Sequence, residues 1–362
     1  MSSAIGSIIK TTVFGESHGI AIGAVMDAPP PGYSINEDEI LVQLSRRAPG
    51  QSKTATSRKE SDTPEFLSGL LDGRTTGAPL AAIIRNSSQH SSDYESLKNT
   101  PRPSHADYPA SVRFNGFNDI RGGGNFSGRL TAPMVALGSV ARQILKANGV
   151  TVGGHVLKIG SVCDSKFDPV NVTSEELDDL NKQYFSVIDK NAKQQMTDLI
   201  EKKAAEGDSI GGVVEIAVTG LTAGIGSPTS RGIENVISTA VFSVPAVKGI
   251  EFGDGFKFAE LSGSEANDSM YYDDKTVKCR TNHQGGISGG ISNGMPLIIR
   301  AALKPTPSIF KEQRTVDLAS GKDTVLKIKG RHDPCIVPRA LPAIEAAICL
   351  ALLDIYSEVK LL

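Results

Sequence analysis

Residues 8–26 read IIKTTVFGESHGIAIGAVM, and this stretch decides which kind of fold the chain can form. Its two ends, 8–14 and 20–26, are rich in apolar and β-branched residues, a pattern typical of short strands. The five residues between them, GESHG at 15–19, are then a turn that joins two strands. The prolines and glycine of APPPG at 28–32 end the second strand. We therefore expect a β-turn-β unit near the start of the chain.

The turn also fits G-x-S-x-G, the pattern around the nucleophilic serine of many hydrolases. In those enzymes the serine lies on a sharp turn from a strand into a helix, where backbone amides help to bind the oxyanion. Because the residues after Ser17 predict a strand that ends at three prolines, no helix can begin there. A serine hydrolase stays an alternative, since His283 and His332 lie downstream and could complete a triad.

The rest of the chain predicts helices and strands in no regular alternation. Asn36 and Glu39 resemble a capping box, which opens a helix that ends at Arg46-Arg47. Apolar periodicity predicts further helices at 131–148, at 174–206 with Ser174 as N-cap, at 231–243 and at 342–356. Strands are expected at 80–85, 151–162, 210–219, 296–303 and 325–329, and a polar loop at 51–64. GGGNFS at 122–127 lacks the spacing of a dinucleotide-binding fingerprint. This order of elements predicts an α+β fold with mostly antiparallel sheets.

Composition is that of an ordinary globular protein and argues against several classes of function. With 362 residues the chain can bury a large core, and its net charge of −2 gives no global attraction to nucleic acid or acidic membranes. No apolar run approaches the ~20 residues of a membrane span, and MSSAIGSIIK at the N-terminus has no apolar signal core. We therefore expect a cytoplasmic protein. The four cysteines lie far apart, which argues against a zinc site and a disulfide framework.

Polar and cationic residues gather in the loops that are rich in glycine and proline. An anion pocket needs this combination, because guanidinium groups make paired hydrogen bonds to phosphate and carboxylate, and glycine lets backbone N–H groups approach a ligand. A single such residue would be a solvated charge or a structural histidine, whereas their occurrence together predicts a site. The set comprises Ser17, His18, Arg46, Arg47, Lys53, Arg102, His105, Arg121, Asn125, Ser127, Arg129, Lys304, Arg331, His332 and Asp333.

The motifs that carry these residues resemble, in order and spacing, those of the chorismate synthase family. They are GESHGIAIGAVMDAPPPG, RRAPGQSK, RPSHADY, IRGGGNFSGR, VKGIEFGDGF, NHQGGISGGISNG, ALKPTPSI and GRHDPCIVPRALPAIEA, and they run from about residue 8 to residue 355. The resemblance implies one chorismate synthase domain over residues 1–362, with two similar α/β halves and no separate reductase domain. It also implies a β-α-β sandwich, in which helices are enclosed between antiparallel sheets, and a homotetramer.

Members of this family are lyases of the shikimate pathway, which leads to the aromatic amino acids. The resemblance implies an anti 1,4-elimination that converts 5-enolpyruvylshikimate 3-phosphate to chorismate, with phosphate leaving C3 and hydrogen leaving C6. It further implies reduced FMN as cofactor, although the reaction has no net redox change. The flavin would be reduced by NADPH on the enzyme or by an external flavin reductase. Because the substrate carries about four negative charges, holding it costs several kcal/mol unless cations pair with it.

By resemblance, the motifs also supply residues with stated roles. Substrate would be bound by Arg47, Lys53, Arg102, Arg129 and Arg331. The implied catalytic set is His18 as the acid that meets the departing phosphate, His105 beside the reduced flavin, Asp333 with flavin N5 in removing the C6 proton, and the hydroxyls of Ser17 and Ser127. Flavin would contact Asn125, Phe126, Ser127, Pro245, Ala246, Gly289, Lys304, Pro305, Thr306, Pro307, Ser308 and Arg331. NADPH, if used, would contact Arg47 and Lys53.

Two positions depart from the family pattern. Lys53 stands where arginine is usual, so a point charge replaces a two-pronged donor, and Asn125 also stands where arginine is expected. The loss of charge at Asn125 predicts a weaker grip on the FMN phosphate or compensation by Lys304. The sequence leaves three functions open: the flavin-dependent lyase, a serine hydrolase acting through Ser17, and a non-catalytic protein that binds flavin or anions.

Overall fold

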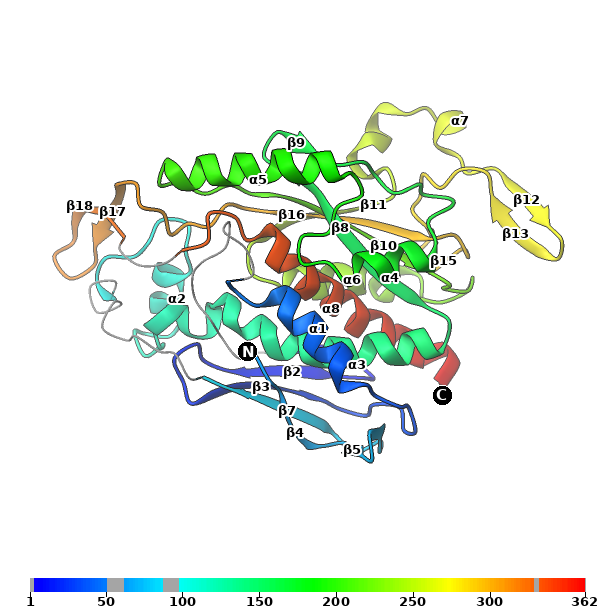
Figure 1. Ribbon diagram of the computed structural model, residues 1–362, viewed down its shortest axis with the longest axis horizontal. Coiled ribbons are helices and arrows are strands. Elements are labelled where there is room, and N and C mark those ends of the chain that lie inside the picture. Colours follow the sequence, from blue (N-terminus) through cyan, green and yellow to red (C-terminus); the bar gives the residue numbers. More distant parts are fainter. Residues whose placement is uncertain (1–2, 51–61, 87–97, 329–331, 362) are drawn as a thin grey trace.

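Within the described residues, which are 3–50, 62–86, 98–328 and 332–361 of this computed structural model, two five-stranded antiparallel sheets enclose a layer of helices (Figure 1). The first sheet has the order β1 (Ala4–Ile5), β2 (Thr11–Gly15), β3 (Ala21–Met26), β7 (Leu80–Arg85) and β4 (Glu65–Ser68). The second has the order β11 (Val247–Phe252), β16 (Leu297–Leu303), β10 (Gly212–Thr219), β8 (Thr151–Ile159) and β9 (Val162–Cys163). The expected α+β class and β-α-β sandwich are confirmed.

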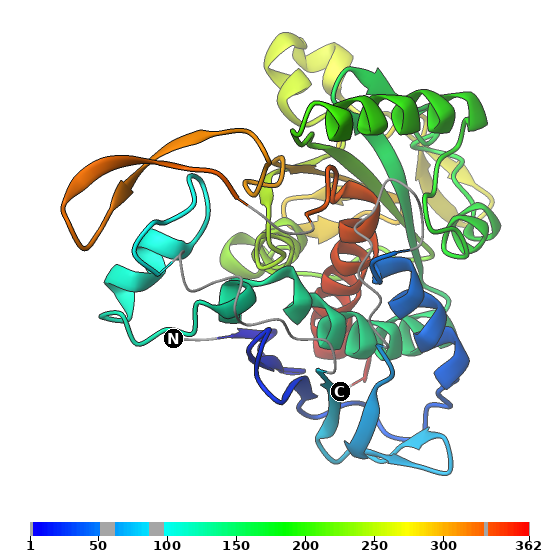
Figure 2. The same ribbon diagram turned by 60° about the vertical axis from the view of Figure 1, so that its left-hand side comes forward.

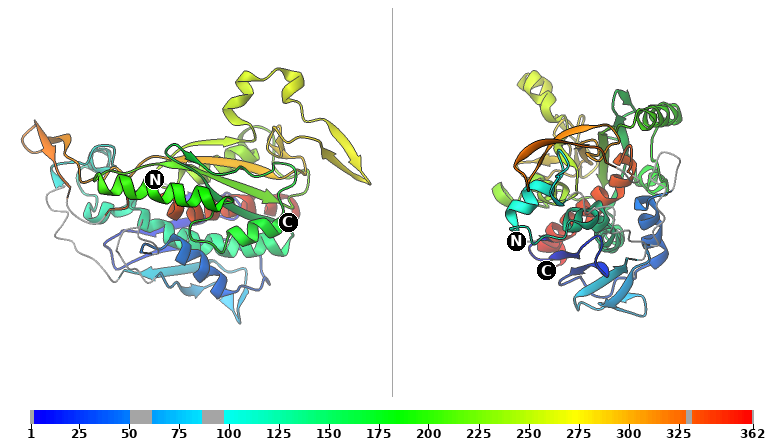
Figure 3. Two further views of the ribbon diagram at one scale, coloured as in Figure 1. Left: turned by 45° about the horizontal axis from the view of Figure 1, so that its top comes forward. Right: turned by 90° about the vertical axis from the view of Figure 1, so that its left-hand side faces the viewer.

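The enclosed layer consists of four helices, and two more cover the outer face of the second sheet (Figure 1; Figure 3). The enclosed helices are α1 (Glu37–Arg47), α3 (Thr131–Ala147), α6 (Ile233–Phe242) and α8 (Val337–Tyr356), and the outer pair is α4 (Ser174–Leu180) and α5 (Lys190–Ala205). Successive glycines of β8 mark the two faces. A Cβ on Gly153 would lie 2.8 Å from Leu177 of α4, and one on Gly154 would lie 3.1 Å from Leu341 of α8. Both faces of this strand therefore carry helices at close range.

Helix α8 is the centre of the core. Every residue of α8 except Arg339 is buried, and its apolar side chains belong to one cluster that extends from Ile5 to Tyr356. The stretch Val337–Val359 has the length and apolarity of a membrane span, yet 94% of its most apolar window is buried inside the protein. Gly138 of α3 crosses α8 at Ala346, so closely that an added Cβ would lie 2.7 Å from the Cα of Ala346. The two helices therefore pack almost backbone to backbone.

Shorter elements extend from this body. Figure 2 shows the hairpin of β17 (Gln313–Asp317) and β18 (Lys322–Leu326) beside α2 (Asp107–Arg113). Two hydrogen bonds hold the hairpin against the segment that precedes α2. The hydroxyl of Thr315 donates to the carbonyl of Pro101 at 2.6 Å, and the amide of Leu318 donates to the carbonyl of Asn99 at 2.8 Å. The others are β5 (Leu70–Leu71), β6 (Arg74–Thr75), α7 (Gly263–Ala266), β12 (Met270–Asp273), β13 (Thr276–Cys279), β14 (Ile287–Ser288) and β15 (Ile291–Ser292).

Most predicted elements agree with the structure, with several differences. The predicted capping box does not form: Asn36 is the N-cap of α1, but its side chain accepts from the amide of Asp38, and its own backbone amide donates to Gln143. The strand predicted at 151–162 is two strands, β8, which ends at Ile159, and β9.

The β-turn-β unit is confirmed, since β2 and β3 pair antiparallel on either side of residues 16–20. The single helix predicted over 174–206 is wrong: α4 and α5 are separated by residues 181–189, and the N-cap is Thr173, which forms a capping box with Glu176. Helix α8 begins at Val337 rather than at residue 342: Pro338 lies in its first turn, where proline is tolerated, and Pro342 lies inside the helix. The strand predicted at 325–329 is β18, which ends at Leu326, and most of the predicted loop at 51–64 lies outside the described residues.

A buried charge network crosses the second sheet. His155 of β8 is fully buried; its Nδ1 lies 2.9 Å from Oδ2 of Asp164, and its Nε2 lies 3.2 Å from Oε2 of Glu215. Glu215 also accepts from Arg300 of β16 at 3.1 Å. Burial opposes a charge on His155, but the two carboxylate hydrogen bonds outweigh it and raise the pKa of the imidazole. His155 is therefore a buried imidazolium between two carboxylates.

This network predicts a pH-dependent contribution to stability. Because the folded pKa of His155 is raised, its contribution is complete below the unfolded value of about 6.5 and is lost as pH rises through the folded pKa. Asp164 and Glu215 have lowered pKa values, so their contribution is lost on acidification instead. Replacing His155 by asparagine should lower the free energy of unfolding by about 3–5 kcal/mol near pH 6, and by less above the folded pKa. Urea unfolding across pH measures the difference.

His283→Asn is the matched control. His283 pairs with Asp254 at 2.8 Å, but its side chain is 26% exposed, so water already solvates the pair. We expect a loss below about 1 kcal/mol for this variant. Equal destabilisation of the His155 variant at pH values below and above the folded pKa would contradict the assigned charge.

Candidate active site

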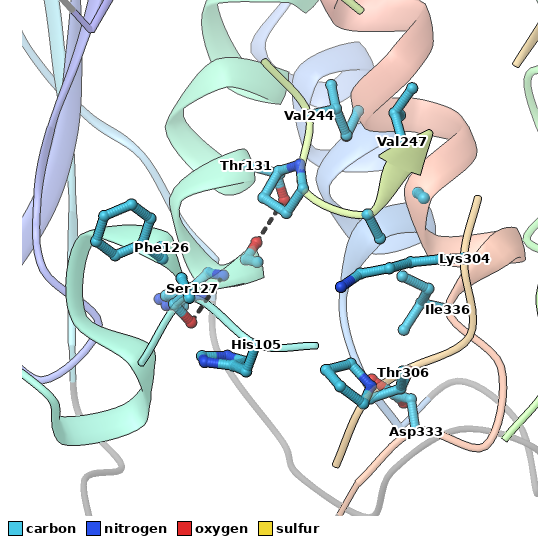
Figure 4. A pocket seen from close by; sticks show the side chains of 18 of the residues that line it. His105, Phe126, Ser127, Thr131, Val244, Val247, Lys304, Thr306, Asp333 and Ile336 are labelled. Atoms are coloured by element: carbon cyan, nitrogen blue, oxygen red, sulfur yellow. Dashed lines mark hydrogen bonds between the residues drawn. The ribbon is translucent and has the colours of Figure 1, made fainter. Parts of the chain in front are cut away.

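A cavity of about 690 Å³ lies where loops from five parts of the chain meet the N-terminal turns of α8. Figure 4 shows His105, Phe126 and Ser127 on one side of it, and Lys304, Thr306 and Asp333 on the other. Among the described residues that line it, the cationic side chains are Arg47, Arg102, Arg129, Lys248, Lys304 and Arg339. Asp333 is the one carboxylate among the same lining residues. The cavity is therefore suited to anions, although the whole chain carries a net charge of only −2.

The adjacent arginines at the end of α1 have different functions. Arg46 points into the helical layer, where it donates to Glu345 of α8 at 2.7 Å. Arg47 points to the cavity, donating to Oδ2 of Asp62 at 2.6 Å and to the hydroxyl of Thr131 at 3.1 Å. One residue of this pair thus anchors the helix, and the next reaches the site.

Asp62 orients two of the cavity's arginines. Its carboxylate accepts from Arg47 through one oxygen and from Arg129 through the other. All three side chains are less than 9% exposed. Arg129 also bonds the side-chain oxygen of Asn86 at 3.2 Å, and its amide bonds the hydroxyl of Ser127. Asp62 therefore fixes the direction of both guanidinium groups at the wall of the cavity.

A second carboxylate, Asp107, orients Arg102 and His105. Arg102 makes a two-pronged ion pair with Asp107, at 2.7 and 2.8 Å, and Nδ1 of His105 lies 2.6 Å from the same carboxylate. Burial would raise the pKa of Asp107, but Arg102 and His105 together hold it below its usual range. An ionised carboxylate can only accept, so Nδ1 of His105 carries the proton. Nε2 of His105 is then left to act on the cavity.

The glycine run 122–124 brings Ser17 and His18 to the edge of the cavity. Gly122, Gly123 and Gly124 all have positive φ, and the carbonyl of Gly124 accepts from the amide of Ser17 at 3.2 Å. A Cβ on Gly122 would overlap the imidazole of His18 and lie 2.7 Å from the hydroxyl of Ser17. Ser17 and His18 are thus less than 9% exposed and lie directly behind Gly122, which itself lines the cavity.

Arg339 is a cavity residue that the sequence analysis missed. It is the only residue of α8 that is not buried, and it pairs with Asp333. Its Nε also donates to the backbone carbonyl of Arg47 at 3.1 Å. Arg339 therefore links the carboxylate predicted to act in catalysis to an arginine predicted to bind substrate. The sequence feature that could have identified Arg339 is that it is the single cationic residue in an otherwise apolar and acidic helix.

The segment 304–308 forms the far wall. Lys304 reaches into the cavity from the end of β16, and Ser308 accepts from Arg102 at 3.3 Å (Figure 4). The hydroxyl of Thr306 is buried and has no hydrogen-bond partner among the described residues. Since buried polar groups are rarely left unsatisfied, this hydroxyl is available to a ligand.

Most predicted site residues meet at this cavity. Asn125, Phe126, Ser127, Pro245, Ala246, Pro307 and Ser308 line it together with Arg47, Arg102, His105, Arg129, Lys304, Thr306 and Asp333. Arg121 instead pairs with Asp119 at the surface, and Pro305 is exposed and is not among the lining residues. Lys53 and Arg331 lie outside the described residues.

Gly289 is not brought to this cavity. Its neighbour Gly290 accepts from the amide of Ile233 at the start of α6, whereas Phe242 at the end of that helix lines the cavity. The ten residues of α6 span about 15 Å. Within one chain Gly289 therefore lies roughly a helix length from the other residues predicted to bind flavin, so the structure does not support its assignment to a flavin site built from a single chain.

The geometry around Ser17 contradicts a nucleophile elbow. Ser17 follows β2 and precedes β3, and the amide of Gly19 closes a turn onto the carbonyl of Glu16 at 3.0 Å. The strand-to-helix turn that exposes a nucleophilic serine does not form at this position. Of the two histidines considered as partners, His283 pairs with Asp254 just beyond the end of β11, whereas His332 lines the cavity next to Asp333. The hydrolase alternative has no structural support.

Comparison with known proteins gives one consistent result. A family model described as "Chorismate synthase" matches residues 9–356. The chain is similar to the chorismate synthase of Thermococcus kodakarensis, with 45% identity over 349 residues that cover 96% of each protein. It is also similar to that of Dehalococcoides mccartyi, with 42% identity over 98% of this chain and 96% of the relative. A solved structure named "Crystal Structure of Chorismate Synthase" matches with a TM-score of 0.75 and 28% identity, covering 98% of this chain and 92% of that one.

The contact at Gly122 yields a test of the site. Gly122→Ala would place a methyl group on the His18 ring at a backbone position of positive φ, so Ser17 and His18 must move. A displacement of about 1 Å in an active site lowers turnover by about a hundredfold. We expect a loss of this order with an unchanged circular-dichroism spectrum. Gly263→Ala is the control, since its Cβ would meet no atom within 4 Å. Normal turnover in the Gly122 variant would show that this contact does not position the two residues.

Proposed function

The chain belongs to the chorismate synthase family, and from that premise we propose that it converts 5-enolpyruvylshikimate 3-phosphate to chorismate and phosphate. The observation that carries the proposal is the cavity, in which cationic side chains surround one carboxylate and one histidine of fixed tautomer. A substrate with about four negative charges requires such a set of cations. Arg47, Arg102 and Arg129 are the described residues that we assign to its phosphate and carboxylates.

The cavity also fits the reduced FMN that we propose as cofactor. Its volume lies in the range of cofactor pockets. Val244, Val247, Ile336 and Ala340 give it apolar surface on which a planar ring system can lie. The unpartnered hydroxyl of Thr306 offers a hydrogen bond, and the glycines at 122–124 allow close approach of a ligand to the backbone.

Different residues around the cavity can carry out the two proton transfers of the elimination, one to the departing phosphate and one from C6. The chemistry that reduced FMN would supply when bound is transient electron donation into the allylic system as phosphate leaves, with return of the electron as the C6 hydrogen is lost, so that there is no net redox change. His18, behind Gly122, is assigned as the acid that protonates the departing phosphate, with Ser17 beside it. Asp333 is assigned as the acceptor of the C6 proton, and Arg339 holds its carboxylate in place. Nε2 of His105 is assigned to a hydrogen bond with the flavin, together with the Ser127 hydroxyl.

An anaerobic assay tests this function. Protein, 5-enolpyruvylshikimate 3-phosphate and chemically reduced FMN should give chorismate, seen by its absorbance, together with one phosphate per chorismate. His18→Ala should lower turnover by about a hundredfold or more, because a positioned acid contributes 10²–10⁴-fold. His105→Ala should also lower turnover, because it removes the hydrogen bond assigned to the flavin. His283→Ala is the control, since His283 does not line the cavity.

Each alternative function predicts a different result in the same assay. Wild-type turnover in both the His18 and the His105 variants would refute the roles assigned to them. Ester hydrolysis that is abolished by Ser17→Ala would favour a hydrolase. FMN binding without chorismate formation would favour a non-catalytic flavin protein.

We also propose that the protein works as a homotetramer in the cytoplasm. The outer face of the first sheet supports assembly, because Phe14 is 43% exposed and Leu67 61% exposed, and Val25 and Ile83 are only half-buried. Light scattering coupled to gel filtration should give four times the chain mass. Phe14→Glu, which charges that face, should shift the mass downwards, whereas Glu37→Gln, at the exposed start of α1, should not. A wild-type mass of one chain at every concentration would refute the tetramer.

A further inference from the structure

Charge compensation divides the cations of the cavity into two groups. The four arginines each have a carboxylate partner: Asp62 for Arg47 and Arg129, Asp107 for Arg102, and Asp333 for Arg339. Lys248 and Lys304 have no carboxylate within ion-pair distance in the part of the chain that the structure describes. Two positive charges on one wall of the cavity are therefore left uncompensated.

The backbone holds Lys304 in this position at both of its ends. Its amide donates to the carbonyl of Ala246 at 2.9 Å, and its ammonium donates to the carbonyl of Ser104. Ala246 and Ser104 both have positive φ, at 74° and 59°, a conformation that is strained for residues other than glycine. Strain of this kind persists where the surrounding structure imposes it, and here both strained residues line the cavity.

Lys248 is directed to the cavity by an irregularity in its strand. Val247 of β11 pairs with Leu303 of β16, but Gly249 pairs with Ala302, so Lys248 is the extra residue of a β-bulge. Bulges next to active sites redirect a side chain that a regular strand would point elsewhere. Lys248 is exposed and lines the cavity, and its strand pairs with β16, which Lys304 follows directly. Burial and then the charge of Lys248 lower the pKa of Lys304, as expected for two close ammonium groups.

We propose that Lys248 and Lys304 together bind a phosphate monoester dianion, namely the phosphate group of FMN. This proposal rests on the function proposed above and adds Lys248 to the site. A dianion between two ammonium groups restores neutrality and forms charge-assisted hydrogen bonds with both. The flavin is favoured over the substrate as the source because Val247, which precedes Lys248, and Val244 line the same cavity and supply apolar surface for a ring system. Lys248 then replaces the charge that is lacking at Asn125.

The test compares FMN with riboflavin, which lacks the phosphate. Fluorescence quenching gives the Kd of each oxidised flavin for wild type, Lys248→Gln and the control Lys257→Gln, whose exposed side chain lies away from the cavity. Lys248→Gln should raise the Kd for FMN about tenfold, which corresponds to about 1.4 kcal/mol, and should leave the Kd for riboflavin unchanged. The dependence of FMN affinity on salt should also decrease. Unchanged riboflavin binding shows that the variant is folded.

Other outcomes overturn the proposal in distinguishable ways. An unchanged FMN affinity in Lys248→Gln, or an equal loss for FMN and riboflavin, would exclude a phosphate contact. If the preference for FMN persists while the KM for 5-enolpyruvylshikimate 3-phosphate rises, the lysines bind the phosphate of the substrate instead. If wild type binds neither flavin, the proposed function itself fails, whatever the lysine variant does.

Discussion

A single buried carboxylate, Glu345, joins the three helices on which the rest of the molecule is built. It lies on α8 with no exposure and accepts from Arg46 of α1 at 2.7 Å and from Arg142 of α3 at 2.8 Å. Burial alone would raise the pKa of Glu345, but the two guanidinium groups hold it below its ordinary value. Breaking such a cluster leaves an uncompensated charge in the core, so the cluster specifies one mutual arrangement of these helices.

The same arrangement places the candidate active site. Arg46 can reach Glu345 only in one rotation of α1, and this rotation turns Arg47 toward the cavity. Arg339 lies six residues before Glu345 on α8, and there it meets both the carbonyl of Arg47 and the carboxylate of Asp333. Core and site thus share two helices, so a shift of α1 against α8 would displace an arginine of the cavity at the same time.

Local sequence patterns predicted most of the helices and strands, whereas the features that they could not predict depend on contacts between residues far apart in the sequence. Turn chemistry predicted the β-turn-β unit, which the structure confirms. Composition singled out polar residues in the loops of the motifs, and the structure brings most of them to one cavity. No local signal distinguishes Arg46 from Arg47, because the difference is made by a partner 299 residues away. Lys248 was missed because a bulge is a property of strand pairing. Gly289 has the glycine-rich context of a ligand loop, yet α6 separates it from the cavity.

The run of three glycines also explains why a turn that resembles a hydrolase motif belongs to a different chemistry. Gly122 faces the ring of His18, whereas Gly123 faces His105, from which its Cβ would be 3.5 Å. One rigid turn thus separates the two histidines, and the carbonyl of Gly124 ties the loop of Ser17 to it. A side chain at Gly122 would displace His18, whereas a Cβ at Gly123 would be in ordinary contact with His105 and one at Gly124 would overlap the backbone of Asp119. The turn at 15–19 therefore acts through His18 and depends on a backbone more than a hundred residues away in sequence.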